Sequence, residues 1–360
     1  MNKIEITRTN GNIPKALPNN DHISAFAFVD ENAMDDVVLL SSVEDWTVEN
    51  AKKLFGDDTI EENMYYVMST FFIKQFYAMA PGASLWVGAY TTDDAVVKMQ
   101  RKAGGEIRQM AMYGSLSVED IIAKVEQLEQ ESMPLLVMIA SNGLEIDNYL
   151  NEEMLLNERI SVVIGEEGET YVPAAGYALG AVAAAAVNES ISWVRKFPVP
   201  VSSASISTTN VNSINQAVLN MLDQKGYIFL RTYTGLNGYY FNDSRTMSDP
   251  TSDYNTIEAV RTMDKAVRGI RTYLLPELGA PLKLDAETGC LAPETVKHLE
   301  TVAAQQLTAM EKAGELSGWS VEIDPAQNVL ATSTVEFVIK NVPIGVMRKA
   351  SVKIGYAQSV

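Results

Sequence analysis

The sequence has few of the residues on which most metal and nucleophilic sites depend. Cys290 is its only cysteine, which excludes an internal disulfide and a multi-cysteine zinc site. His22 and His298 are its only histidines, and they lie near opposite ends of the chain. A histidine-rich metal site or a Ser-His-Asp triad would therefore need distant residues to meet through folding. We expect no enzyme activity and no cofactor.

Several motifs and segment types are also absent. The sequence has no Gly-x-x-x-x-Gly-Lys-Ser/Thr run, no Gly-x-Gly-x-x-Gly after a predicted strand and no Gly-x-Ser-x-Gly elbow, so nucleotide-binding and hydrolase functions lose their usual support. No stretch reaches the roughly 18 apolar residues of a membrane helix, and residues 1–20 lack the apolar centre of a secretory signal. We expect no membrane insertion and a chain that stays in the cytoplasm where it was made.

Positive charge is scarce as well. The chain has 28 basic and 46 acidic residues, a net charge of −18, which argues against nucleic acid as a partner because phosphate binding depends on Lys and Arg. Residues 1–224 hold 14 basic and 31 acidic residues, whereas residues 225–360 hold 14 and 15. The two portions are therefore expected to face different surroundings.

The pattern of apolar residues predicts an α/β domain followed by an α+β domain. Alternating predicted strands and helices fill residues 21–203, and a polar run at Ser202–Asn215 resembles the passage out of this domain. The predicted strands are 23–29, 36–40, 84–90, 109–113, 135–140, 161–164, 227–232, 239–242, 320–323 and 334–339. The predicted helices are 47–55, 61–79, 117–130, 150–157, 174–187, 257–275 and 293–311.

Both ends of the chain alternate apolar and polar residues, which is typical of half-buried strands. Ile4 and Ile6 alternate with polar residues at the amino end, and Val352, Ile354 and Tyr356 do so near the carboxyl end. Strand patterns at both extremes suggest that each is held by a neighbouring sheet, which could belong to another subunit. The predicted organisation is therefore an arm at 1–20, domains at 21–203 and 204–345, and a second arm at 346–360.

The predicted helix at 257–275 carries a one-sided pattern of charge. Its basic residues share one stripe, and its apolar residues Met263, Val267, Ile270 and Leu274 occupy the other face. If the apolar face is buried, a basic ridge points outward and can dock on an acidic partner, or it is simply solvated. The residues of this stripe are Arg261, Lys265, Arg268 and Arg271.

The remaining candidates have structural explanations. Carboxylate-rich patches at 57–62 and 166–169 could bind a cation but are typical of solvated turns. Cys290 could be a nucleophile, yet no base accompanies it, so a buried small side chain is expected. The helix at 174–187 is rich in Ala and Gly, which predicts close packing against another element.

The order of several short motifs resembles contractile tail sheath proteins. Gly238–Asp243, Asp253-Tyr254, Ile257-Glu258 and Arg261 with Asp264–Arg268 are similar to the carboxy-terminal domain of that family. Gly314–Gly318, Ile323-Asp324, Asn328–Leu330 and Val342–Gly345 are similar to the end of the same family. Leu39–Ser42, Leu54–Gly56, Phe71-Phe72 and Leu85–Tyr90 resemble its opening, whereas residues 98–203 carry only general α/β character.

This resemblance implies a tail-sheath-like architecture of two domains with extended terminal β-strand arms. Such a subunit polymerises with itself as stacked hexameric rings around an inner tail tube protein, between baseplate and terminator proteins, and contracts to drive the tube through a cell envelope. It would assemble in the bacterial cytoplasm and end in a virion tail or a contractile injection particle. The resemblance assigns the tube contact to Arg261, Lys265, Arg268 and Arg271, and the arms to Ile4, Ile6, Val352, Ile354 and Tyr356.

Three other functions remain open from the sequence. The chain could be another repeating tail, baseplate or capsid component, although a tube subunit would be shorter and more strongly β. It could be a metal-dependent hydrolase with an acidic site, or a monomeric binding module whose termini fold back on itself. The sequence does not distinguish a phage from a bacteriocin or another injection system.

Overall fold

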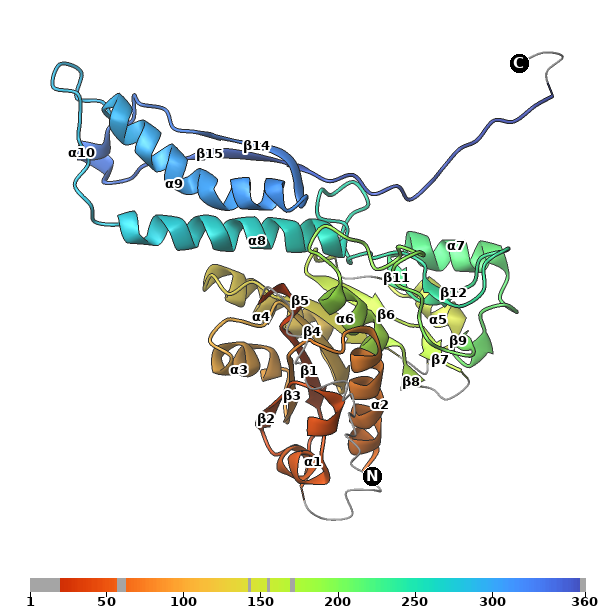
Figure 1. Ribbon diagram of the computed structural model, residues 1–360. Coiled ribbons are helices and arrows are strands. Elements are labelled where there is room, and N and C mark those ends of the chain that lie inside the picture. Colours follow the sequence, from red (N-terminus) through yellow and green to blue (C-terminus); the bar gives the residue numbers. More distant parts are fainter. Residues whose placement is uncertain (1–19, 57–62, 142–143, 154–155, 169–171, 357–360) are drawn as a thin grey trace, which may run out of the picture. The chain divides into compact units, whose positions relative to one another are not determined.

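The computed structural model describes residues 20–56, 63–141, 144–153, 156–168 and 172–356 (Figure 1). The chain forms two compact units, Met1–Arg268 and Gly269–Val360, so the division falls inside helix α8 (Ile257–Leu274). The units do not divide at residues 203 and 204, because a strand at Tyr227–Ile228 joins the main sheet of the first unit. The roles of residues 1–20 and 346–360 as arms, and of residues 21–203 and 204–345 as domains of an assembled subunit, remain predictions.

A seven-stranded sheet forms the centre of the first unit, with the strand order β11-β6-β5-β4-β1-β3-β2. Its strands are parallel except β2, which runs antiparallel to β3 at one edge. All six residues of β1 are buried, as expected for a parallel strand covered on both faces. The strands are β1 (Ser24–Val29), β2 (Asp36–Leu40), β3 (Leu85–Tyr90), β4 (Gln109–Gly114), β5 (Leu136–Ala140), β6 (Ile160–Val163) and β11 (Tyr227–Ile228).

Helices cover both faces of this sheet. Helices α3 and α4 lie on one side, and α2 and α6 lie on the other (Figure 1). Phe26 of β1 stacks on Phe72 of α2 with ring centroids 5.1 Å apart, which fixes α2 to the sheet. The helices of the first unit are α1 (Val48–Phe55), α2 (Met64–Met79), α3 (Ala95–Lys102), α4 (Val118–Gln130), α5 (Ile146–Asn151), α6 (Ala175–Ala184) and α7 (Gln216–Gln224).

Helix α6 packs closely against α2, as its Ala and Gly content predicted. A Cβ atom added at Gly176 would lie 2.5 Å from the carbonyl oxygen of Phe72, and one at Gly180 would lie 2.6 Å from that of Phe76. The two backbones can approach this closely only because the glycines have no side chain. The prediction of a tight helix contact is therefore confirmed.

Two small sheets complete the first unit. One has the strand order β10-β9-β7-β8, and the other pairs β12 with β13 in antiparallel fashion. Between β13 and α8 the chain runs without regular strands or helices, apart from antiparallel bridges that join Arg245 to Thr256 and Met247 to Asn157. The strands are β7 (Glu166–Glu167), β8 (Val172–Pro173), β9 (Ala204–Ile206), β10 (Thr209–Asn210), β12 (Leu230–Arg231) and β13 (Tyr240–Phe241). Short 3-10 helices are η1 (Asn20–His22) and η2 (Val43–Asp45).

The second unit is an α+β arrangement. Helix α9 (Pro293–Lys312) packs on strand β14 (Leu316–Glu322), which pairs antiparallel with β15 (Val338–Pro343). Leu291, Leu299 and Ile323 form a small buried cluster. The 3-10 helix η4 (Leu275–Glu277) and helix α10 (Val329–Thr332) lie in its connections, and residues 344–356 have no regular secondary structure.

Most predicted elements correspond to observed ones, with several differences. The helix predicted at 150–157 is wrong in position, since α5 ends at Asn151. The strand predicted at 227–232 is divided between β11 and β12, which lie in different sheets, and the strand predicted at 334–339 begins and ends before β15 does. Helices α3, α7 and α10 and the short strands β7 to β10 were not predicted. The strand predicted at 351–356 is not paired in the single chain, and the amino-terminal strand with Ile4 and Ile6 lies outside the described residues. The mixed α/β and α+β class is confirmed.

No helix in the described part of the chain combines the length and the apolar character that crossing a membrane requires.

Candidate functional site

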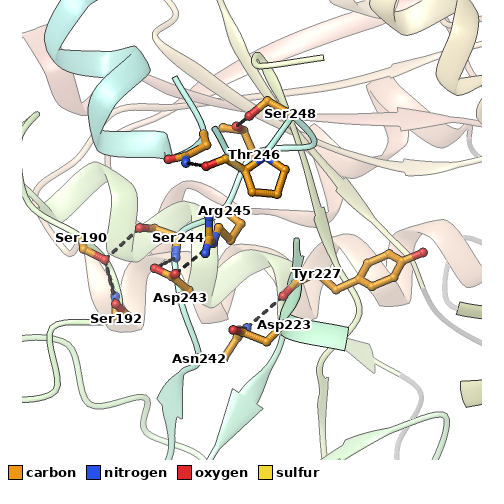
Figure 2. A network of polar contacts seen from close by, with 12 residues as sticks. Ser190, Ser192, Asp223, Tyr227, Asn242, Asp243, Ser244, Arg245, Thr246 and Ser248 are labelled. Carbon is orange, nitrogen blue, oxygen red and sulfur yellow. Dashed lines mark hydrogen bonds and ion pairs between the residues drawn. The ribbon is translucent and has the colours of Figure 1, made fainter. Parts of the chain in front are cut away.

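A buried polar network lies in the segment that leads from β13 to α8, where the sequence carries its clearest sheath-like motif (Figure 2). Asn242 follows β13 directly, and its side-chain amide donates to Asp223 at 2.7 Å and to the carbonyl of Tyr227 at 3.0 Å. Its side-chain oxygen accepts from the backbone amide of Phe229 at 2.8 Å. Asn242 therefore joins its own segment to α7 and to the chain around β11.

Ser244 is the centre of the same network and is fully buried. Its hydroxyl donates to the Glu258 carboxylate at 2.6 Å, so the Ser190 hydroxyl, 2.8 Å away, donates to Ser244. The carbonyl of Ser244 accepts from the amide of Ile257 at 2.8 Å. Glu258 lies in the first turn of α8, where a carboxylate is favoured by the unpaired amides of the helix start. The network therefore fixes where α8 begins.

Two further contacts hold the loop itself. Arg245 forms an ion pair with Asp243 at 3.1 Å (Figure 2). The Thr246 hydroxyl donates to the carbonyl of Tyr254 at 2.8 Å. The polar side chains named above thus bond within the fold, which is the arrangement of a structural junction.

The basic stripe of α8 meets the carboxylate of Asp21, which lies just before the first strand of the sheet. The Asp21 carboxylate lies 2.8 Å from the Lys265 ammonium and 3.3 Å from the Arg268 guanidinium. Arg261 donates to the carbonyl oxygen of Asp21 at 3.2 Å and reaches the carbonyl of Ala185 at 3.4 Å. Burial opposes ionisation of Asp21, but the contact with Lys265 and the charges of Lys265, Arg268 and Arg261 outweigh it, so the pKa of Asp21 is lowered.

Asp264, on the same helix, forms a second buried ion pair. Arg159 contacts both Asp264 oxygens, at 2.8 and 3.0 Å, and also the Glu129 carboxylate at 2.6 Å. Burial disfavours the charged guanidinium, but the hydrogen bonds to Glu129 and Asp264 outweigh it and raise the pKa of Arg159 above its ordinary value. Arg159 therefore stays charged and holds α8 to the loop before β6.

The outward orientation expected for the basic ridge is wrong for most of its members. Arg261 is only 4% exposed, whereas Val267 on the supposedly buried face is 51% exposed. The reason is that Asp21 and the carbonyl oxygens after α6 supply acceptors inside the fold, so the guanidinium is better placed inward. Arg271 is exposed and lies in the second unit. The tube contact assigned to Arg261, Lys265, Arg268 and Arg271 stays a prediction.

The carboxyl-terminal segment has the exposure expected of an arm without its partner. Val352, Ile354 and Tyr356 are 81%, 96% and 111% exposed, and they recur at every second residue. Strands β14 and β15 form a two-stranded sheet, so each has an edge that no strand of the described chain covers. The second unit thus offers both an unpaired apolar segment and open sheet edges, while Ile4 and Ile6 lie outside the described residues.

The other candidates that lie in described residues have structural surroundings. The residues at 57–62 lie outside the described part, and Glu166 accepts from Ser205 and from the amide of Thr208 in a structural role. Cys290 is partly exposed in a turn and not buried as expected, with its thiol near the carbonyl of Thr288. Across the described residues, no three His, Cys, Asp or Glu side chains gather as a metal site would require.

Sequence patterns missed Asp21 and Arg159, although both hold α8. Neither stands in a motif, because each meets its partner only through folding. The sole signal was the charge of α8 itself: four cations on one stripe require acceptors wherever that stripe is buried.

Comparison with known proteins identifies the family to which the chain belongs. Residues 1–245 match the model described as DUF2586, N-terminal domain, and residues 253–360 match DUF2586, C-terminal domain. No curated protein matches the sequence. The two matched segments together cover nearly the whole chain and meet in the loop before α8.

Solved structures with a similar fold come from contractile particles. A chain of the anti-feeding prophage baseplate aligns with a TM-score of 0.67 at 14% identity, covering 99% of both chains. A chain of the PVC sheath complex, from an extracellular contractile injection system in the contracted state, gives 0.65 at 12% identity, covering 100% of this chain and 98% of that one. The sheath tail protein Lin1278 from Listeria innocua gives 0.56 at 10% identity, with 91% and 96% covered. The sheath-like fold is therefore confirmed.

Proposed function

Because the chain belongs to the DUF2586 family and shares its fold with contractile sheath proteins, we propose that it is the repeating structural subunit of a contractile tail sheath. The observation that carries this proposal is the likeness in fold over essentially the full length of both chains. A protein that shared only one domain with sheath subunits would not align from end to end.

In this proposal the chain polymerises with itself as stacked hexameric rings around an inner tube protein, and baseplate and terminator proteins close the two ends. Assembly takes place in the bacterial cytoplasm, and the product is a phage tail or an injection particle. The extended lattice relaxes to a contracted one with better-buried interfaces, which drives the tube through an envelope. The subunit needs no cofactor and performs no catalysis.

Strand addition would link the subunits. The segment with Val352, Ile354 and Tyr356 would pair with an open edge of the β14–β15 sheet in a neighbouring copy, and the amino-terminal segment with Ile4 and Ile6 would form a second link. Main-chain hydrogen bonds give such a link its affinity, while the rest of the interface stays free to change. Arg348, Lys349 and Lys353 give this tail a positive charge, which favours approach to an otherwise acidic chain.

For the tube contact, Arg271 is the exposed member of the basic stripe and the residue on which we place this part of the proposal. Arg261, Lys265 and Arg268 would act indirectly, by fixing α8. An acidic patch on the tube would be the matching surface.

The test is electron microscopy of the purified full-length chain beside a variant that lacks residues 351–360. We expect hollow cylinders from the full-length chain and dispersed subunits from the truncated one. The truncated chain should keep its free energy of unfolding, because residues 351–356, the described part of the deleted segment, are all exposed. Dispersed monomers from both chains would reject self-assembly.

A second candidate is a baseplate component, favoured by the likeness to a chain of the anti-feeding prophage baseplate. The same images separate the two functions. A baseplate component would give single rings that do not stack, whereas a sheath subunit gives cylinders of variable length.

A further inference from the structure

Asp21 collects contacts from two separate parts of the first unit. Its carboxylate is paired with Lys265 and Arg268 of α8, at 2.8 and 3.3 Å. Its carbonyl oxygen accepts from Arg261 of α8 at 3.2 Å and from Gln109 of β4 at 3.1 Å. Asp21 is only 8% exposed, so these contacts are shielded from solvent. One residue thus joins the entry of the chain to α8 and to the central sheet.

The position of Asp21 in the chain shows which segments its contacts connect. It lies between the amino-terminal twenty residues and strand β1, in the short helix η1. The covalent connection between residues 1–19 and strand β1 runs through this helix. On the other side, Lys265 and Arg268 occupy the last turns of α8 before the helix continues into the second unit at Gly269.

We infer that Asp21 is a mechanical coupling residue, through which a load on the amino-terminal segment is transmitted to helix α8. In the sheath subunit proposed above, on which this role rests, the amino-terminal segment is held by a neighbouring copy. Movement of that neighbour would then act on α8 of the next subunit directly, through the side-chain contacts of Asp21, as well as on the central sheet. The coupling would make contraction spread from subunit to subunit.

The physical basis is that a buried charge cluster resists separation. Pulling Asp21 away would leave Lys265 and Arg268, whose side chains are 18% and 22% exposed, without this carboxylate, and a largely buried charge that loses its partner is disfavoured. The contact therefore either holds or breaks as a whole, which is the behaviour needed to transmit a load. A contact in open solvent would yield gradually, since water replaces each partner.

Single-molecule pulling tests the inference on the full-length chain. Handles are attached at cysteines introduced by Asn2→Cys and Leu275→Cys, with Cys290→Ser removing the only native thiol. The parent chain should show a high-force rupture event, which is lost in Asp21→Asn and kept in Asp21→Glu. Asp36→Asn is the matched control, because Asp36 pairs with Lys102 at 3.0 Å on the surface. An unchanged rupture event in Asp21→Asn overturns the inference.

A variant on the helix side guards against misfolding of Asp21→Asn. Combined Lys265→Met and Arg268→Met substitutions remove the same contacts and must abolish the same event. Failure of the parent chain to form cylinders would reject the proposed function but leave the pulling result unaffected. If cylinders form, Asp21→Asn should give partly contracted ones after urea treatment, whereas the parent contracts as a whole; uniform contraction of both would overturn the role in spreading.

Discussion

At the scale of single residues, the ion pairs of α8 matter because they are buried. The Arg159 and Asp264 side chains are 8% and 7% exposed, whereas those of Lys102 and Asp36 are 53% and 45% exposed. A pair in water contributes little because solvent screens it and replaces it readily. A buried pair that loses one partner leaves a charge that the interior cannot solvate. Breaking the buried Arg159–Asp264 pair should therefore cost more stability than breaking the exposed Lys102–Asp36 pair.

Arg159→Met should destabilise the fold by about 3–5 kcal/mol, because Asp264 stays buried without its partner. Lys102→Met, which breaks the exposed pair, should cost about 0–1 kcal/mol. Urea denaturation followed by circular dichroism measures both. Equal losses would show that Asp264 finds another partner or becomes neutral.

The low pKa of Asp21 predicts a specific acid response. Its folded pKa lies below the ordinary 3.8, so the ionised form stabilises the fold above that pH, and this contribution is lost as the pH falls through the folded value. The groups that face it are Lys265, Arg268 and Arg261 of α8, with Arg108 and Asp264 close by.

We therefore expect the stability of Asp21→Asn to fall less steeply than that of the parent chain as the pH drops below about 4. Denaturant titrations at a series of pH values give the two curves. Curves that run parallel would show that Asp21 has the same pKa folded and unfolded.

The side chains of α8 also show which features of the helix the sequence does not predict. Its length and its two faces follow from the periodicity, but the pattern does not say which face is buried. That choice depends on Asp21, which is more than two hundred residues away in the sequence, and on carbonyl oxygens after α6. Arg261 is buried because these acceptors lie within hydrogen-bond distance of its guanidinium. The sequence around Arg261 does not predict them.

At the scale of elements, strands with continuous apolar runs were the most predictable. The predicted strand at 84–90 and helix at 257–275 differ from β3 and α8 by one residue at one end. The missed helix α3 has an amphipathic pattern over only eight residues, which is short for recognition. The tail at 351–356 has a strand pattern but pairs with no strand among the described residues, and a strand forms only where another supplies its hydrogen bonds.

The contact between α2 and α6 is so close that one added methyl group should lower the free energy of unfolding. Gly176→Ala places a carbon within 2.5 Å of the Phe72 carbonyl oxygen, so either the helices separate or the backbone shifts. We expect a loss of about 1–3 kcal/mol in unfolding free energy. Gly318→Ala in β14 is the control, because no atom lies within 4 Å of its added carbon. A neutral Gly176→Ala would mean that α6 moves freely on α2.

At the scale of the whole molecule, net charge opposes the association of copies. Each chain carries −18, and most of the excess lies in residues 1–224. Like-charged copies repel across solvent, and salt shortens the range of this repulsion from roughly 30 Å at 0.01 M to about 8 Å at 0.15 M.

Raising the salt concentration should therefore speed cylinder formation, as followed by light scattering. The chain without residues 351–360 should stay dispersed at every salt concentration. Slower assembly with added salt would indicate that attraction between the basic tail and acidic surfaces of other copies dominates over the general repulsion.

The exposed tail also affects how readily a protease can cleave a copy of the chain that has not assembled. An extended segment with Val352, Ile354 and Tyr356 in solvent fits the active site of a protease, since proteases bind their substrates as extended strands. Once paired with another copy, the same segment is no longer available for cleavage. In the proposed sheath, proteolysis would therefore remove copies that have not assembled, and the segment proposed to join subunits would also limit the amount of free subunit.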